Sequence, residues 1–439
     1  MNTSVIDFFF NPRSVAVIGA SPNPLRGGNA LIKNLQRGYS GSIYPVNPKY
    51  REIEGLSCFR KVSHIGRPVD LAIVFVSAHL VPEVLRDCGA ADVRGVMIES
   101  GGFAETGQKG SALQETCRQI GEEMGMRLWG PNCMGLVDAR RDLVFSFLNP
   151  AIWEKGLTPG DVSLIVQSGM LSAGFLIDLM SHGTMGVSKV CSIGNKVDVD
   201  ECELLDYLLS DRHTATVALY LEEISKGQAF LHVARRSEKP IVVLKGGKSP
   251  RGARAAMSHT ASLSGDDRVV RGALAQANIV EAEDFKQMMD LSRALPMVSE
   301  GVGRGRAAIL TFSGGAGILS ADFLTSHGMD LAHLSRKTCR GLEEFFPSWM
   351  PVANPIDLWP AAEVLGGAEA YRRTVEVLMD DDRVVVLLLH AFAGGFRLDL
   401  DLEALAANSQ EPWKRSMPCA RMDSADERWP YKSPLVRFR

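Results

Sequence analysis

Residues 14–21 read Ser-Val-Ala-Val-Ile-Gly-Ala-Ser, and this stretch decides the fold. A short apolar run that ends in glycine is typical of a buried strand of a parallel sheet. A polar loop follows as far as Gly28, and residues 29–35 have the composition of a helix. Strand, glycine turn and helix together predict a βαβ unit, and therefore an α/β fold with a parallel sheet.

The same alternation continues and predicts three domains. The first is a Rossmann-like domain over residues 1–140, with further strands at 42–45, 71–76, 95–98 and 126–129. The second covers 145–297, with strands at 162–166, 187–192, 215–220 and 240–244, and residues 153–160 before it are predicted to be a linker. The third covers 303–439 and opens with a strand at 307–312.

The second and third domains contain similar segments. Residues 168–176, Ser-Gly-Met-Leu-Ser-Ala-Gly-Phe-Leu, are followed shortly by Ser-His-Gly at 181–183, and residues 313–324 are followed shortly by the same three residues at 326–328. Chance similarity of two strand-to-helix turns is the alternative, but we favour a duplicated, doubly wound, flavodoxin-like domain. After Phe396 the pattern weakens, and residues 413–439 predict neither a strand nor a stable helix, so the completeness of the third domain stays open.

The composition is that of a globular protein without a strong charge. Hydrophobic residues make up 46% of the 439 residues, charged residues 23%, and the net charge is -3. No basic field attracts nucleic acid or a membrane surface, so phosphate binding must be local. No apolar run approaches the ~18 residues of a membrane span. The eight cysteines lack CxxC or zinc spacing, which predicts no metal site and a cytoplasmic, reducing location.

Four loops after predicted strands of the first domain favour a phosphate-containing ligand. Gly19, Ser21 and Asn23 belong to a glycine-containing turn that leads into a helix, which suits a phosphate group. A nicotinamide-binding domain would have an acidic residue after the second strand, but Lys49 stands there instead, and favours an extra phosphate. Loops with Ser100, Gly101 and Asn132 follow later strands, where ligands bind in open α/β sheets. A surface lysine and ordinary turn residues are the alternatives.

Two motifs of the second domain point to phosphoryl chemistry. Gln167, Ser168 and Gly169 open a helix whose backbone N–H groups could bind phosphoryl oxygens, although Ser168 alone reads as an N-cap. No GxSxG surrounds Ser168, so it is not expected to be a nucleophile. Residues 246–263 form a predicted cationic loop of small residues around His259. Imidazole titrates near neutrality and is a competent nucleophile, and such a loop could carry it between ligands.

Together these motifs resemble the ADP-forming acyl-CoA synthetases and their relative succinyl-CoA synthetase. The resemblance rests on VIGAS, YPVNPK, GPN, QSG, YLE, SHTAS and NPIDL, in this order, to about residue 410. It implies that the first domain binds CoA through Ser21, Lys49, Ser100 and Asn132. It further implies that His259 carries phosphate, that Glu222, or Glu223 in reserve, steadies its imidazole, and that residues 167–169 hold the phosphate.

The resemblance also implies a partner. In the family a separate ATP-grasp domain binds ATP or ADP with magnesium, and no such domain is recognisable in the 439 residues. We therefore expect an α-type subunit that acts on a small carboxylic acid or its acyl-CoA, in an oligomer with an ATP-grasp subunit. A non-catalytic CoA-binding module, related to the N-terminal regions of protein acetyltransferases, is the alternative, and a truncated pseudo-subunit is a third reading.

Overall fold

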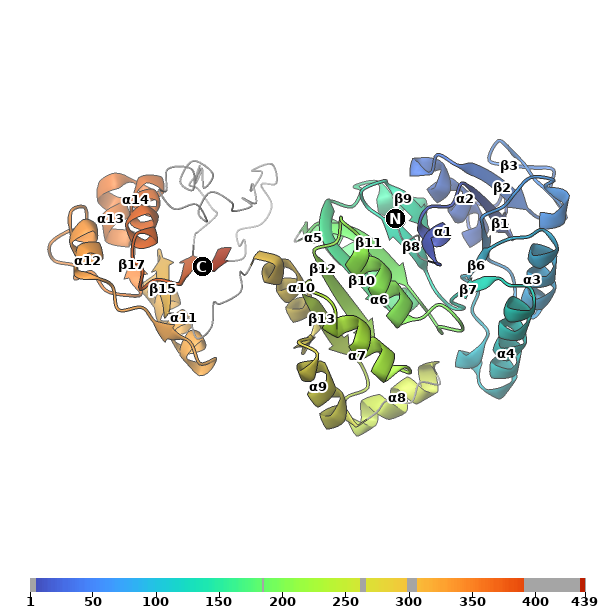
Figure 1. The fold of residues 1–439 in the computed structure, drawn as a ribbon. Coiled ribbons are helices and arrows are strands. Elements are labelled where there is room, and N and C mark those ends of the chain that lie inside the picture. The colour runs from blue at the N-terminus through green and yellow to red at the C-terminus, as the bar shows by residue number, and fades with distance from the viewer. Residues whose placement is uncertain (1–4, 184, 261–265, 298–305, 391–434, 439) are drawn as a thin grey trace. The chain divides into compact units, whose positions relative to one another are not determined.

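The computed structural model describes residues 5–183, 185–260, 266–297, 306–390 and 435–438 (Figure 1). The chain divides into two compact units, Met1–Pro296 and Met297–Arg439, and each is described by itself.

The first sheet of the first unit is parallel throughout, in the order β2-β1-β5-β6-β7. Its strands are β1 (Ser14–Ile18), β2 (Ser42–Val46), β5 (Leu71–Val74), β6 (Gly95–Ile98) and β7 (Arg127–Trp129). Its helices are α1 (Asp7–Phe10), α2 (Gly27–Gly38), α3 (Val81–Ala90) and α4 (Gln108–Glu123). Short elements lie between them: β3 (Glu52–Ile53), β4 (Leu56–Ser57), η1 (Val62–His64), η2 (Ala78–Leu80) and η3 (Ala104–Thr106). The strands predicted over residues 14–129 are confirmed to within two residues at their ends.

The second sheet has the order β14-β13-β12-β10-β11-β8-β9. Its strands are β8 (Gly135–Asp138), β9 (Leu143–Phe145), β10 (Pro159–Val166), β11 (Val187–Ser192), β12 (Thr216–Leu221), β13 (Ile241–Lys245) and β14 (Val280–Ala282). Its helices are η4 (Pro150–Trp153), α5 (Gly169–His182), α6 (Glu201–Ser210), α7 (Gly227–Arg235), α8 (Pro250–Thr260), α9 (Asp267–Gln276), α10 (Phe285–Ala294) and η5 (Leu295–Met297). From β10 to β14 the strands are parallel, as predicted for a doubly wound domain.

Strands β8 and β9 were not predicted. β8 pairs antiparallel with β11, and β9 pairs with β8, so residues 135–145 extend the second sheet although most of them were assigned to the first domain. The predicted linker at 153–160 is also shorter than expected, because Trp153 is buried in the core and β10 already begins at Pro159. Strands β8 and β9 are too short for an alternation of apolar and polar residues to be recognised in the sequence.

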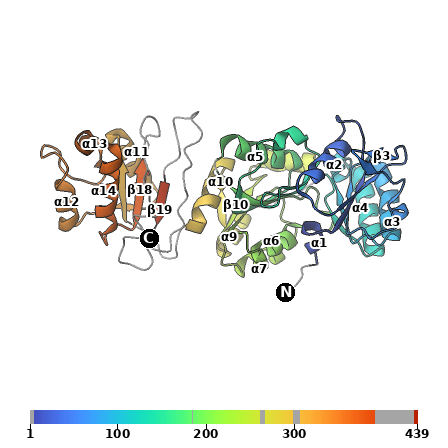
Figure 2. The same ribbon diagram turned by 90° about the horizontal axis from the view of Figure 1, so that it is seen from above.

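Alternating side chains of the second sheet fill two cores. Val162, Leu164 and Val166 pack with α5 and α10, whereas Ile165 belongs to the core of α6 and α7. Figure 2 shows α5 on one side of this sheet and α6 and α7 on the other. The second of these cores continues into the first sheet, where the rings of Phe9 and Trp129 lie 5.3 Å apart. The two sheets therefore share apolar packing within one unit.

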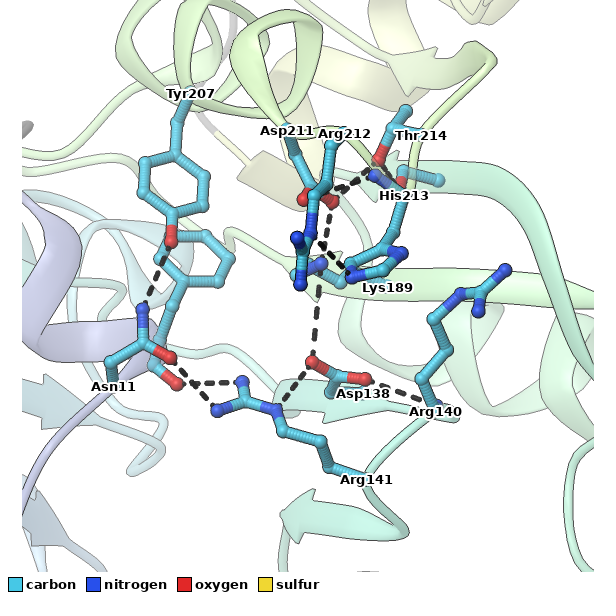
Figure 3. Close-up of polar contacts among 12 residues, drawn as sticks. Asn11, Asp138, Arg140, Arg141, Lys189, Tyr207, Asp211, Arg212, His213 and Thr214 are labelled. Atoms are coloured by element: carbon cyan, nitrogen blue, oxygen red, sulfur yellow. Dashed lines mark hydrogen bonds and ion pairs between the residues drawn. The ribbon is translucent and has the colours of Figure 1, made fainter. Parts of the chain in front are cut away.

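A closed polar network ties the amino-terminal side of the second sheet together (Figure 3). Lys189 on β11 is buried, and its Nζ lies 2.5 Å from Asp211 Oδ2 and 3.9 Å from Asp138 Oδ2. Arg141 donates to Asp138 and to Asn11, which links β8 to the residue after α1. Each charged group of this network therefore has a partner of opposite charge or a hydrogen bond within the fold.

The second unit has a smaller sheet in which β15 lies between β16 and β18, with β17 also paired to β15 and β19 antiparallel to β18. Its strands are β15 (Arg306–Thr311), β16 (Asp330–Leu331), β17 (Ile356–Asp357), β18 (Val386–His390) and β19 (Leu435–Phe438), and its helices are α11 (Gly314–Ser326), α12 (Arg336–Glu343), α13 (Trp359–Leu365) and α14 (Gly367–Met379). The expectation of no strand in residues 413–439 is wrong for β19, and the residues between Phe396 and β19 lie outside the described chain.

The similar segments of the two units have the same local structure. β15 lies between β16 and β18 as β10 lies between β11 and β12, and all four pairings are parallel. Ser168 and Ser313 both cap the helix that follows, by accepting the N–H three residues on. Gly183 and Gly328 both adopt positive φ after the helix. These shared features agree with the duplication predicted from the sequence.

No helix in the described part of the chain is long and apolar enough to cross a membrane.

Candidate functional site

The loop between β1 and α2 is shaped for close approach of backbones. Gly19 has φ +90°, and a Cβ there would lie 2.2 Å from the Phe75 carbonyl oxygen, so no other residue fits. The predicted side chains brace this loop: Ser21 Oγ accepts the N–H of Asn23, and Asn23 Oδ1 accepts the N–H of Leu25. No side chain caps the start of α2, so backbone donors at this end of the helix are available to an anionic group.

Lys49 lies on the exposed loop after β2. Its backbone N–H donates to Asn47 Oδ1, and its ammonium has no ion-pair partner among the residues that the structure describes. Residues 45–48 contain no carboxylate for a ribose hydroxyl. A free cation at this position therefore suits a phosphate group better than a nicotinamide dinucleotide.

Ser100, Gly101 and Asn132 lie together at the carboxyl ends of β6 and β7. The Asn132 N–H donates to the Ser100 carbonyl, and a Cβ on Gly101 would lie 3.2 Å from Asn132 Oδ1. The Ser100 hydroxyl is buried and bonds to the backbone of Val74 and Val76, so it positions the loop. Of these three, Gly101 and Asn132 are the more accessible to a ligand.

Residues 167–169 form the start of α5, as predicted, but their side chains bond within the fold. Gln167 is buried, and its Oε1 accepts the N–H groups of Glu222 and Glu223. Ser168 caps the helix through Leu171 N–H at 3.4 Å. A Cβ on Gly169 would lie 3.6 Å from Met134 N and 3.8 Å from Asn132 O. The start of α5 therefore adjoins the loop that carries Asn132.

The segment around His259 was predicted to be a loop, and this is wrong as far as Thr260, because residues 250–260 form α8. Pro250 opens the helix, Ser249 Oγ accepts the Gly252 N–H, and the alanines that follow favour helix. The structure describes the backbone of His259 but not its side chain, and residues 261–265 lie outside the described chain. α8 packs against η3, which follows the Ser100–Gly101 loop.

Glu222, at the carboxyl end of β12, is buried and held on several sides. Tyr220 donates to its carboxylate at 3.4 Å, and Lys245 Nζ donates to its backbone carbonyl at 2.6 Å. Burial, the Glu222 charge and its hydrogen bond raise the pKa of Tyr220 to about 12. Burial lowers the pKa of Lys245, although Glu222 and Glu223 oppose this. These contacts fix Glu222 beside Gln167.

Two titratable groups near Asn132 have shifted pKa values. Burial raises the pKa of Glu99 well above its usual range, although a hydrogen bond from the Phe147 N–H opposes this rise. Burial also opposes ionisation of Glu105, but hydrogen bonds from Asn195 and from the N–H groups of Gly102 and Phe103 outweigh it, and the pKa of Glu105 falls. The charged Glu105 thereby orders the loop after Gly101.

The sequence interpretation missed Asn195 and Lys196. Asn195 follows β11 and bonds to Glu105 of the first domain, and Lys196 donates to the Glu223 carbonyl at 3.0 Å. Their place directly after a parallel strand, at the edge where ligands bind, was the signal that could have revealed them.

Two family comparisons cover this region. Residues 13–139 match the family described as a CoA binding domain, and residues 159–295 match the succinyl-CoA ligase like flavodoxin domain.

A relative that matches most of the chain shows the family. The chain is 37% identical over 387 residues to the acetate–CoA ligase [ADP-forming] II subunit alpha of Pyrococcus furiosus, which covers 88% of this chain and 82% of the relative. The chain belongs to the ADP-forming acyl-CoA synthetase family. It is also 38% identical to acetate–CoA ligase [ADP-forming] II of Archaeoglobus fulgidus, over 85% of this chain but only 55% of that longer protein.

A solved member of this family has the same fold. The dinucleotide forming acetyl-coenzyme A synthetase 1 of Ca. Korarchaeum cryptofilum, in complex with phosphate and ADP, superposes with a TM-score of 0.78 at 33% identity. The match covers 86% of this chain and 80% of that one. The fold class predicted from the sequence, a CoA-binding domain followed by flavodoxin-like ligase structure, is thereby confirmed.

Proposed function

We propose that this chain is the α-type part of an ADP-forming acyl-CoA synthetase, which interconverts acyl-CoA, phosphate and ADP with the free acid, CoA and ATP. The observation that carries the proposal is the meeting of Asn132 and Gly169, because it brings the CoA-type loops and the start of α5 to one place. The α8 helix, which carries His259, packs beside the same loops through η3.

The proposed reaction has three balanced steps. Phosphate attacks the acyl carbonyl and the CoA thiolate leaves, which gives an acyl phosphate and CoA. An imidazole nitrogen of His259 then attacks phosphorus, the P–O bond to the acyl group breaks, and the free acid leaves as its carboxylate. The phosphoryl group finally passes from His259 to the β-phosphate of ADP, which restores the imidazole and gives ATP.

The candidate residues of the second domain each have a proposed role in these steps. The N–H groups at the start of α5 bind phosphoryl oxygens and stabilise their charge, with Gln167 and Ser168 fixing the local backbone. Glu222 accepts the other ring N–H of His259, which fixes the tautomer and leaves one nitrogen free to attack. Tyr220 donates to the Glu222 carboxylate, and the Glu222 N–H donates to Gln167 Oε1, and these two contacts support this orienting role.

CoA is proposed to bind the first sheet. Gly19, Ser21, Asn23 and the uncapped α2 start bind its pyrophosphate, and Lys49 pairs with its 3′-phosphate. Gly101 and Asn132 contact the pantetheine end, because they lie nearest to α5. Ser100 supports them from the core.

Nucleotide binding requires structure beyond the residues described above. An ATP-grasp domain, which binds ADP or ATP with magnesium, is proposed to act with this chain in an oligomer. The chain spans about half the length of the Archaeoglobus relative, and most of the length of the Pyrococcus alpha subunit. The seven cysteines in the described part of the chain are free, which agrees with a cytoplasmic location.

Reconstitution tests the proposal. The chain is mixed with an ATP-grasp chain from the same organism, ADP, magnesium, phosphate and a set of short acyl-CoA thioesters, and ATP is measured with luciferase. ATP should form with both chains present and should be lost with His259→Asn. ATP that forms equally well with His259→Asn, or CoA binding without any turnover, would favour the non-catalytic CoA-binding module.

A further inference from the structure

The segment after β11 connects the two halves of the proposed site. Gly194 has φ +56°, and a Cβ there would lie 2.1 Å from the Pro131 carbonyl oxygen. The N–H of Asn195 donates to the same Pro131 oxygen, and the N–H of Val197 donates to Gly130 O, both at 2.9 Å. The backbone of 194–197 therefore lies directly on the loop that presents Asn132.

The side chain of Asn195 fixes two loops of the first domain. Its Nδ2 donates to Glu105 Oε2 at 2.7 Å and to Gln114 Oε1 at 2.9 Å, and its Oδ1 faces Asn132 Nδ2 at 3.4 Å. The other oxygen of Glu105 accepts the N–H groups of Gly102 and Phe103. One amide of the second domain thus sets the distance between the Gly101 turn and Asn132.

Lys196, the next residue, contacts the opposite half of the site. Its φ of +55° turns the chain, and its buried ammonium pairs with Glu201 at 3.0 Å and donates to the Glu223 carbonyl at 3.0 Å. The N–H groups of Glu222 and Glu223 both donate to Gln167. Hydrogen bonds, joined through the backbone of Asn195, Lys196 and Glu223, therefore lead from the Gly101 turn to Gln167.

We propose that Asn195 is a positioning residue that couples CoA binding in the first domain to phosphate binding at the start of α5. The inference rests on the proposed function, which supplies the two ligands. Each ligand orders one side of the same junction, so the second ligand finds it already ordered and binds more tightly. Because linkage is reciprocal, phosphate strengthens CoA binding by the same factor as CoA strengthens phosphate binding.

Calorimetry on the whole chain tests the coupling. CoA is titrated into wild type, Asn195→Ala and Asn195→Leu, with and without inorganic phosphate. In wild type, phosphate should tighten CoA binding by about fivefold or more. Both variants lack the amide that donates to Glu105 and Gln114, so in each the ratio of CoA affinities with and without phosphate should fall to about one. Each variant should still melt cooperatively, within about 5 °C of wild type. Asn149→Ala is the matched control, because Asn149 is exposed and only caps η4, and it should keep the wild-type ratio.

The outcomes separate the inference from the proposed function. A variant that folds and keeps the wild-type ratio overturns the role of Asn195, and so does wild type that binds both ligands independently. If Asn195→Ala melts early, Asn195→Leu, which has a similar size and adds no charge, decides. Wild type that binds neither CoA nor phosphate contradicts the proposed function instead.

Discussion

The amino-terminal and carboxyl-terminal ends of the strands in the second sheet differ in what their polar groups contact. At the amino-terminal side, Lys189, Asp138, Asp211 and Arg141 satisfy one another, and the network closes on itself (Figure 3). At the carboxyl side, Gly169 and the start of α5 present backbone donors beside another loop, and glycines allow the close approach. Shifted pKa values occur at both ends, so a shifted pKa alone does not identify the site. Backbone N–H groups that the fold leaves available to a ligand indicate a binding site better than a shifted pKa does.

The largest effect is expected on the free energy of unfolding, from a change at the amino-terminal side of the second sheet. Lys189→Met leaves the Asp211 carboxylate without its ammonium partner, although Arg141 still pairs with Asp138, and should lower the free energy of unfolding by about 3–5 kcal/mol. Urea denaturation followed by circular dichroism measures it. Arg236→Met, which breaks the exposed pair with Asp206, is the control and should cost less than about 1 kcal/mol. Equal losses in the two variants would show that burial of the Lys189 network does not matter.

At the carboxyl ends of the strands, Gly194→Ala should weaken CoA binding while the second sheet stays folded. Its Cβ meets the Pro131 carbonyl, and φ is positive, so the loop that presents Asn132 must move. We expect the CoA dissociation constant to rise by about tenfold, which corresponds to about 1.4 kcal/mol. Gly227→Ala, where a new Cβ has no neighbour within 4 Å, should leave it unchanged. Unaltered CoA affinity in Gly194→Ala would separate this junction from the CoA site.

A smaller effect is expected at the rim of the first sheet. Lys49→Ala should reduce the preference for CoA over dephospho-CoA by about twofold to fivefold, because an exposed charge pair contributes at most about 1 kcal/mol. Calorimetric titrations with both ligands measure the ratio. Lys286→Ala on the exposed side of α10 is the control, and should keep the wild-type preference. An unchanged preference in Lys49→Ala would assign the 3′-phosphate to another cation.

The smallest effect concerns pH. Burial opposes ionisation of Asp211, but the Lys189 ammonium outweighs it and holds the pKa of Asp211 below its usual value of 3.8. A carboxyl with a lowered pKa contributes stability above its unfolded pKa, and this is lost as pH falls through the folded pKa. Wild type should therefore lose stability below about pH 4 more steeply than Lys189→Met. Urea midpoints measured between neutral pH and pH 3 compare the two slopes, and parallel slopes would contradict the assignment.

The sequence predicted the parallel strands of both sheets because short apolar runs that alternate with helical segments are local signals. It could not predict β8, since its partner β11 lies some 50 residues away and antiparallel pairing at a sheet edge is a tertiary event. It could not predict β9 either, because β9 pairs with β8. It predicted a loop where α8 forms, because glycines and cations were weighed above the helix-favouring alanines.

The candidate site divides in the same way. Gly19, Asn132 and Gly169 each follow a strand, and this position alone led to the prediction that they contact a ligand. Asn195 joins residues 63 and 90 positions away, and only the packed domains bring these together. Ser100 and Gln167 were predicted as ligand contacts, yet the folded chain engages their side chains with its own backbone.

Phosphorylation of His259 tests the central proposal most directly. The chain is incubated with acyl-CoA and labelled phosphate, or with labelled ATP and the ATP-grasp partner, and the label is followed through brief acid and base treatment. Phosphoramidate bonds are labile to acid and stable to base, which distinguishes them from phosphoserine at Ser258. The proposal predicts label that acid removes, that is absent in His259→Ala, and that Glu222→Gln reduces without loss of CoA binding. Label that survives acid, or that persists in His259→Ala, would contradict it.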